Sequence, residues 1–574
     1  MWLELAFCLL FFLLLTFGLA WPGASRLQLD SAEKLAASAL LSLLVIFLTA
    51  FAIFVAHLPA ATVWILPLAA VIGVVRQWRS LADTLRDANA RALLTGQFLV
   101  TGWCLGWLWF ISSYTGGGWT SDWFEHWERT LFFIDRWPTD FQFLGVYALP
   151  ARPPLANLVT GFFLQLAQCN FAHYQLFTLL LNTLAFLPAA LLVRRFSRQT
   201  GVAGPSGSRA AVAVLAVLLM LNPSFVENAT FAWTKLTAVF FILTGLYFFL
   251  RALDPSAPRA AGPLCALAFA AALLTHYSAG PYVLLLAVGW FLLQRGRWRA
   301  AGFWRQSGVL ALIGGLVLAT WFAWSLAVYG AHTTLLSNSS VTVKDVHSGN
   351  QLLRVALNLR DTIVPHFLRP LDGALITQSS RWGYWHDWLF QLYQVNLFFV
   401  FGSVAWLVLL RELARAWVTS PATSRWFWAL FTGGVIVLGV AVHGARDIWG
   451  LAHICLQAVV VLGLAWLAAR WATLTGAWRI VLMVGTAVDF LLGILLHFAV
   501  QSYALDRWLT PEFTPEAILR SYSESSLMNA EAKMIHHLGF FHDAFGFRAG
   551  VVLGFLALML FLALAGARNR VRAA

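Results

Sequence analysis

The sequence has 574 residues, of which 60% are hydrophobic and only 11% are charged. Soluble domains carry roughly 25% charged residues, so this composition excludes an ordinary soluble protein. The net charge of +13 does not indicate a nucleic-acid partner, because the arginines are concentrated in short segments between apolar runs.

Apolar runs long enough to cross a bilayer recur along the chain. A spanning helix needs about 20 mostly apolar residues, and the sequence does not have the alternating ten-residue strands of a membrane barrel. We therefore predict an all-α fold, a polytopic transmembrane bundle of about 15 spans. The expected spans are 2–20, 37–57, 60–75, 93–112, 172–193, 210–222, 230–250, 261–275, 281–294, 307–329, 393–410, 426–442, 450–469, 480–500 and 547–567.

The loops between alternate spans are short and rich in arginine. Such loops face the cytoplasm, so one orientation satisfies the whole chain, with the N-terminus outside and the C-terminus cytoplasmic. The first run carries Glu4 and has Arg26 after it, which favours a true span over a signal peptide. The arginine-over-lysine bias indicates a bacterial inner membrane.

The long loops 113–171, 330–392 and 501–546 then lie outside and hold most of the acidic residues. No cytoplasmic loop is long enough for a nucleotide-binding domain, and the sequence contains no GxxxxGK[ST] motif. These features argue against ATP hydrolysis by a P-loop. We expect the polar chemistry on the external side, with any activated substrate supplied there or from the membrane.

The first external loop contains GGGWTSDWFEHWERTLFFIDRWP, residues 116–138. Trp123 and Trp127 begin an apolar stripe at helical spacing, which predicts an interfacial helix with tryptophan at headgroup depth. Asp122 and Glu125 have the spacing of a capping box. Alternatively, a carboxylate beside a bilayer has a raised pKa that suits general-base catalysis. Glu128 and Asp135 are interpreted as surface charges.

The same loop continues as GVYALPARPPLANLVTGFFLQL. Two prolines follow Arg152, and a helix can begin directly after them. The apolar run 155–169 is too short to span, so we predict a second interfacial or re-entrant helix. Arg152 is either an anchor at the membrane surface or part of a site.

At these residues the sequence resembles the membrane-embedded glycosyltransferases of the GT-C class. It is most similar to the bacterial branch that includes aminoarabinose transferases and protein O-mannosyltransferases. Their external acidic motif and PPL-type segment correspond to SDWFEHWE at 121–128 and ARPPLANL at 151–158. The run NTLAFLPAALLVRRF at 182–196 resembles the span that follows in those families.

The resemblance implies a glycosyltransferase that moves a sugar from a polyprenyl-phosphate donor to an acceptor hydroxyl of a lipid or glycan on the periplasmic face. Asp122 would match the catalytic base of a single inverting displacement, with Glu125 as the second candidate. The lipid phosphate that leaves needs positive charge around it. The chain would comprise extra N-terminal spans at 1–91, a catalytic core at 92–330, and further spans and external segments at 331–574.

Further polar residues stand near the expected outer ends of spans. Candidates for substrate binding are His126, Arg152, Lys235, His276, Tyr277, His443 and Arg446. The last five of these residues also have a structural interpretation: Lys235 as a snorkelling lysine, and the others as turn residues. His126 with Glu125 or Glu128 leaves a divalent cation open, but no metal-ligand spacing identifies such a site.

Two other functions stay open from the sequence. Asp489 lies in the middle of an expected span, where an acid either serves a proton-coupled transporter or hydrogen-bonds a neighbouring helix. A transporter or flippase of lipid-linked glycans would show inverted repeats and paired broken helices, and we expect neither. An envelope polysaccharide ligase or polymerase would use the arginines and histidines of the loop 330–392.

Overall fold

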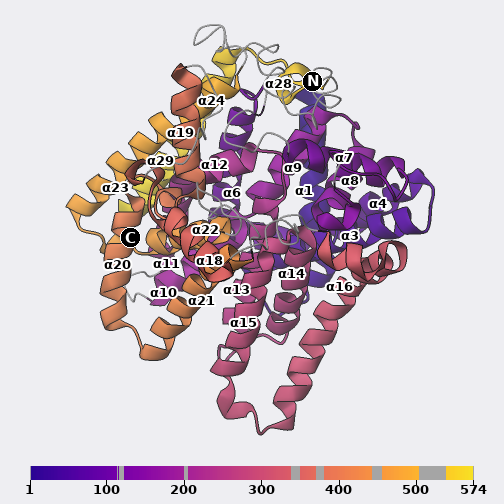
Figure 1. Cartoon of the computed structure of the whole chain (residues 1–574), viewed down its shortest axis with the longest axis horizontal. Coiled ribbons are helices and arrows are strands. Elements are labelled where there is room, and N and C mark those ends of the chain that lie inside the picture. Colours follow the sequence, from indigo (N-terminus) through magenta and orange to yellow (C-terminus); the bar gives the residue numbers. More distant parts are fainter. Residues whose placement is uncertain are drawn as a thin grey trace.

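The computed structural model describes residues 2–112, 114, 122–145, 147–199, 205–337, 350–369, 381–442, 456–502 and 538–572. In these ranges the chain folds as a bundle of helices (Figure 1), and Phe143 and Tyr147 form an isolated antiparallel bridge. The prediction of an all-α polytopic fold is confirmed.

The N-terminal half contains these helices: α1 Trp2–Leu13, α2 Trp21–Ala24, α3 Ser31–Val55, α4 Ile65–Arg76, α5 Trp78–Arg86, α6 Ala88–Leu108, α7 Asp122–Asp135, α8 Leu155–Leu166, α9 Phe171–Thr183, α10 Phe186–Gln199, α11 Pro205–Met220, α12 Pro223–Thr230, α13 Lys235–Ala252 and α14 Ala261–Thr275. The rest of the described chain contains α15 Gly280–Leu293, α16 Ala301–Leu336, α18 Gln351–Ile363, α19 Arg381–Val395, α20 Ala405–Thr419, α21 Ala422–Ala441, α22 Leu456–Ala469, α23 Gly476–Asp489, α24 Leu496–Gln501, α28 Phe541–Ala544 and α29 Ala549–Arg572.

Among the described residues, eight helices are long and apolar enough to cross a membrane, or up to 10 if each of two bent pairs counts as one span. The first expected span lies within Trp2–Ala24 and the tenth within Ala301–Leu336. Several other expected spans are shorter apolar helices, such as Ala261–Thr275. The chain is therefore a multi-pass membrane protein, and the figure of about 15 spans stays a prediction.

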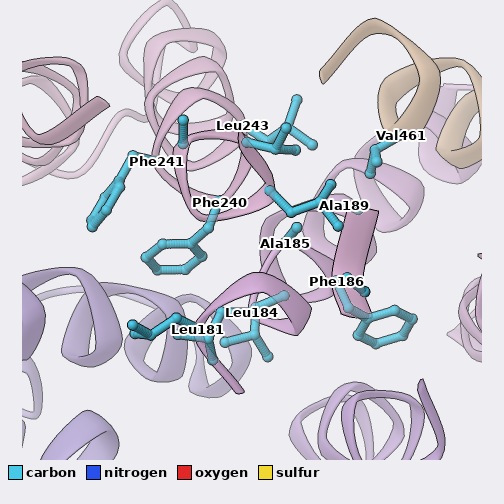
Figure 2. Close-up of a cluster of buried hydrophobic side chains, with 14 of the residues drawn as sticks. Leu181, Leu184, Ala185, Phe186, Ala189, Phe240, Phe241, Leu243 and Val461 are labelled. Atoms are coloured by element: carbon cyan, nitrogen blue, oxygen red, sulfur yellow. The ribbon is translucent and has the colours of Figure 1, made fainter. Parts of the chain in front are cut away.

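The centre of the bundle is built from helices that bury almost every residue. An 18-residue apolar stretch within Phe171–Arg198 is fully buried and that of Lys235–Ala252 is 89% buried, whereas the corresponding stretches of α16 and α29 are only 11% and 17% buried. Figure 2 shows side chains of the buried cluster that the inner helices share, among them Phe186 and Ala189 of α10, Phe240 and Leu243 of α13 and Val461 of α22. Since the outer helices expose leucine and valine, their apolar faces are the ones available to lipid.

Two helix pairs among the described residues are bent, each either a broken span or a re-entrant segment. The bend is 73° between α4 and α5, and 71° between α11 and α12. At the second bend Asn222 caps α12, where its side chain accepts from the Phe225 amide at 2.8 Å, and Pro223 occupies the first turn. Glu227 and Asn228 are buried in α12.

Asn182 of α9 holds the non-helical link between α12 and α13. Its side-chain amide lies 3.3 Å from the Asn228 carbonyl oxygen and 3.5 Å from that of Phe231. Its Oδ1 accepts from the amide and hydroxyl of Thr237, at 3.1 and 2.9 Å. These backbone groups are buried away from water, so one side chain satisfies several polar atoms of an irregular segment. The link ends at Lys235, the first residue of α13.

Replacing Asn182 by Leu should destabilise the protein by about 1–3 kcal/mol, because it leaves buried donors and acceptors unsatisfied. Thermal unfolding of the detergent-solubilised protein measures the loss. Gln142→Leu is the matched control, because this exposed amide bonds only the nearby carbonyl of Asp140. Equal unfolding temperatures for the two variants would show that the link does not depend on Asn182.

Candidate functional site

Helix α7 carries the acidic motif, and its aromatic stripe faces protein. Trp123 and Trp127 are buried, with ring centroids 5.1 Å from those of Phe171 and Tyr174 on α9, respectively. The predicted helix is confirmed, and these two tryptophans pack against protein, while their depth in the membrane stays a prediction. Packing against α9 fixes the rotation of α7 and thereby the direction of its charged side chains.

Glu125 lies at the centre of a buried ion network. Its Oε1 accepts from the Arg129 Nε at 2.9 Å, and its Oε2 lies 3.5 Å from the Arg152 Nη2. The side chains of Glu125 and Arg129 are each 1% exposed, and Arg129 also donates to the Leu149 carbonyl at 2.7 Å. The guanidinium of Arg129 stands 4.3 Å from the ring centroid of Phe143. The network therefore joins α7 to the segment that precedes the two prolines.

The two arginines control the protonation of Glu125. Burial alone would raise the pKa of this carboxyl, but the charges of Arg152 and Arg129 outweigh burial and lower the pKa to about 2. Glu125 is therefore a permanent carboxylate at neutral pH. Its oxygens face arginines, which excludes the capping-box interpretation of this side chain.

Asp122 lies in a different environment at the start of α7. It is half-buried and accepts no hydrogen bond from any residue that the structure describes. The pKa of Asp122 is raised above its ordinary value, mainly by burial and also by the negative charge of Glu125. The positive charges of Arg152 and Lys235 lower this pKa but do not cancel the increase. Two carboxylates one helical turn apart thus differ in protonation behaviour, because one is paired and the other is not.

Lys235 supplies positive charge from the other side of the site. It is buried at the first turn of α13, with its Nζ 3.6 Å from the ring centroid of Trp233. Its charge acts on the Asp122 carboxylate together with that of Arg152. The fold thus brings together Asp122, Arg152 and Lys235, which are up to 113 positions apart in the sequence.

His126 and Glu128 are buried on α7. The Nδ1 of His126 lies 3.2 Å from Asn157 Oδ1, which can only accept, so this nitrogen carries the proton. Burial lowers the pKa of His126 to about 3, and the ring is neutral. Glu128 accepts from the Leu144 amide at 3.1 Å and is no surface charge, contrary to our interpretation, whereas Asp135 is exposed.

His276 and Tyr277 form the turn between α14 and α15. The Nδ1 of His276 accepts from the Ser278 amide at 3.1 Å, which caps a short 3-10 turn. The hydroxyl of Tyr277 donates to the Pro150 carbonyl at 3.1 Å. The turn is thereby fastened to the loop that carries Arg152.

His443 and Arg446 lie outside the described residues. Within the described ranges, no group of three histidine, cysteine, aspartate or glutamate side chains could hold a metal ion. The role of each candidate residue, and a divalent cation at Glu125 and His126, therefore stay predictions.

Asp489 of α23 has hydrogen-bond partners. It accepts from the Tyr393 hydroxyl at 2.9 Å and from the Ser403 amide at 2.8 Å. The adjacent Gly402 has φ 117°, and a Cβ there would stand 2.5 Å from the Asp489 Oδ2. These contacts match the expectation that Asp489 hydrogen-bonds a neighbouring segment.

Arg129 and Asn157 are the site residues that our sequence analysis did not select. The four-residue spacing from Glu125 to Arg129 is that of a helical ion pair. It could have been noted, although the same spacing is common on exposed helices. Asn157 has no comparable local pattern, because its partner His126 is 31 positions away.

No protein-family model matches the sequence, and no curated protein matches it. Two solved structures are similar to the chain: ArnT from Cupriavidus metallidurans bound to undecaprenyl phosphate, and the same protein in the apo state. For the first, the identity is 15% and the TM-score is 0.45, over 84% of this chain and 78% of the other. For the second, the values are 15% and 0.43, over 83% and 78%.

Replacing Arg129 by Leu should destabilise the protein by about 3–5 kcal/mol, because it leaves Glu125 buried with only the more distant Arg152 as partner. Chemical denaturation of Arg129→Leu, Glu125→Leu and the double variant measures the coupling. We expect the double variant to lose less stability than the sum of the two single losses.

The control for this cycle is Arg86→Leu, which breaks an ion pair to Asp83 whose side chains are 78% and 73% exposed. Its unfolding midpoint should stay close to that of the parent protein. Additive losses in the Glu125 and Arg129 cycle would contradict a coupled network.

Proposed function

We propose that the chain is an integral membrane glycosyltransferase that moves a sugar from a polyprenyl-phosphate donor to an acceptor hydroxyl on the external face. The observation that carries this proposal is the half-buried Asp122 carboxylate, which accepts no hydrogen bond from the described residues and lies within the fields of Arg152 and Lys235. A base and two cations at one place are what such a transfer requires.

In the proposed reaction the acceptor oxygen attacks the anomeric carbon while Asp122 removes its proton. A bond forms between this oxygen and the anomeric carbon, and the bond from that carbon to the phosphate oxygen breaks. The electron pair stays on the polyprenyl phosphate, whose negative charge Arg152 and Lys235 would stabilise. The displacement inverts the anomeric configuration.

Asp122 is a better base than Glu125 in this site. A carboxylate with a pKa of about 2 is a weak base at neutral pH, and both of its oxygens already face arginines. Glu125 instead holds Arg152 in place, and Arg129 ties Glu125 to the loop. Substrate contacts by His126, His276 and Tyr277 belong to the same proposal, as do those of His443 and Arg446.

The alternative functions have weaker support in the described structure. Arg360 and Arg369 of the loop 330–392 pair with the buried Asp361 at 2.6 and 3.2 Å, so these arginines are engaged within the protein. This disfavours an envelope ligase that would use them on its substrate. The bend between α11 and α12 and the buried Glu227 fit a transporter, since the Oε1 of Glu227 accepts no hydrogen bond from the described residues and lies 3.9 Å from His497 Nδ1.

Asp122→Asn should reduce sugar transfer by a factor of about 100 or more, because the amide cannot accept the proton. The assay uses the purified chain in nanodiscs, a native lipid extract as acceptor, and polyprenyl-phosphate-linked mannose, glucose and aminoarabinose as donors. Release of polyprenyl phosphate measures turnover. An unchanged unfolding temperature checks that the variant folds.

Full turnover by Asp122→Asn would exclude Asp122 as the base. If the parent protein releases no polyprenyl phosphate from any donor but moves a labelled lipid-linked sugar across a liposome membrane, the transporter is the correct function.

Lys235→Gln should move the acidic limb of the pH–activity profile to higher pH. Asp122 acts as a base only when ionised, so activity falls as the pH drops through its pKa. Lys235 lowers that pKa, and its removal raises it. Profiles of kcat/KM from pH 4 to 9 measure the shift, with the exposed Arg295→Gln as control. A limb that stays in place or moves to lower pH would contradict the arrangement.

A further inference from the structure

A polar cavity of about 790 Å³ lies at the junction of α3, α4 and α5, and none of its lining residues belongs to the candidate site. Its lining includes Ser31, Lys34, Arg76, Arg79, Ser80 and Thr84. The volume is within the range of ligand pockets, roughly 300–1,000 Å³. The positive-inside pattern assigns these residues to the cytoplasmic side.

The positive charges of this cavity are not neutralised by neighbours. Lys34, Arg76 and Arg79 form no ion pair with any residue that the structure describes. The acidic residue in the lining, Asp83, is exposed and lies 3.4 Å from Arg86. Three like charges around one cavity repel one another and create a field that attracts an anion.

The acids nearest to the start of α3 point elsewhere. Asp30 pairs with Arg194 of α10 at 3.0 Å. Glu33 accepts from Arg251 of α13 at 2.9 Å and from the Tyr247 hydroxyl at 2.7 Å. Both carboxylates are thereby used to join α3 to the core, and Lys34 is left as the charged residue that this end of α3 contributes to the cavity.

Several other arginines assigned to the cytoplasmic side are paired with acids. Arg411, Arg415 and Arg470 surround the fully buried Glu412, with distances from 2.5 to 3.3 Å. Arg195 pairs with Asp254 at 2.8 Å. The three cations of the cavity differ from these arginines, because none of them pairs with an acid that the structure describes, although the guanidinium of Arg79 stands 5.9 Å from the ring centroid of Trp78.

Helix α5, which lines the cavity, has the pattern of an interfacial helix. It turns by 73° from the apolar α4, and in it Trp78 and Leu85 are exposed while the remaining positions are largely polar. A short helix of this pattern lies along the interface with its tryptophan among the headgroups. Lipid phosphates lie at this depth.

We propose that this cavity binds a phosphate group through Lys34, Arg76 and Arg79, with the hydroxyls of Ser31, Ser80 and Thr84 as further donors. Phosphate carries the negative charge and the acceptor oxygens that such a set of side chains matches. The phosphate belongs either to an anionic phospholipid of the adjacent leaflet or to a soluble phosphate ester. The site is independent of the proposed transferase activity.

The test compares the detergent-solubilised full chain with Lys34→Gln/Arg76→Gln/Arg79→Gln. Thermal unfolding is followed during titration with phosphatidylglycerol, with phosphatidylcholine as the neutral lipid and glycerol phosphate as the soluble ester. We expect phosphatidylglycerol to raise the unfolding temperature of the parent, and the triple variant to bind it at least about tenfold more weakly. The effect should weaken with salt.

The matched control is Arg295→Gln/Arg299→Gln/Arg305→Gln, which removes the same charge from exposed positions on the same predicted face. It should retain the affinity of the parent protein. Saturation by glycerol phosphate would assign the site to soluble esters, and a response to the lipid alone would assign it to the membrane. Equal affinity in the parent and the cavity variant, or an equal loss in the control, would overturn the proposal.

Discussion

The candidate site depends on one buried carboxylate that holds two arginines. Glu125 is nearly inaccessible to solvent and touches Arg129 on its own helix and Arg152 on the following loop. A charge in this position is tolerable only because opposite charges and hydrogen bonds surround it. In return it fixes the distance between the amphipathic helix and the proline segment, which otherwise have no shared secondary structure.

The network also divides the charge of the site unevenly. Arg129 donates hydrogen bonds to Glu125 and to two backbone carbonyls. Arg152 makes a longer contact of 3.5 Å with Glu125, and its side chain is 19% exposed. The guanidinium of Arg152 can therefore also interact with other negatively charged groups. Both arginines contact the buried Glu125, and neither forms an ion pair with the half-buried Asp122. The two carboxylates therefore have different environments.

Periodicity and composition predicted much of the architecture. The stripe from Trp123 to Ile134 gave the helix α7, the prolines after Arg152 gave the start of α8, and Lys235 stands at the start of α13 as expected. The sequence did not reveal what the stripe faces, since a tryptophan suits a headgroup region and a protein interior equally. It also could not show that Glu227 is buried, because the segment around Asn222 packs against residues far along the chain, such as Val400, whose carbonyl accepts from the Asn222 side chain at 3.0 Å.

The link held by Asn182 has an electrostatic consequence for α13. The first turn of a helix has amide groups without intrahelical partners, and the aligned peptide dipoles place about half a positive charge there. No side chain caps α13 at Thr234, and Asn182 occupies the amide of Thr237. The remaining partial charge of the helix end lies at Lys235 and adds to its ammonium. The positive end of α13 thus coincides with the lysine whose charge acts on Asp122.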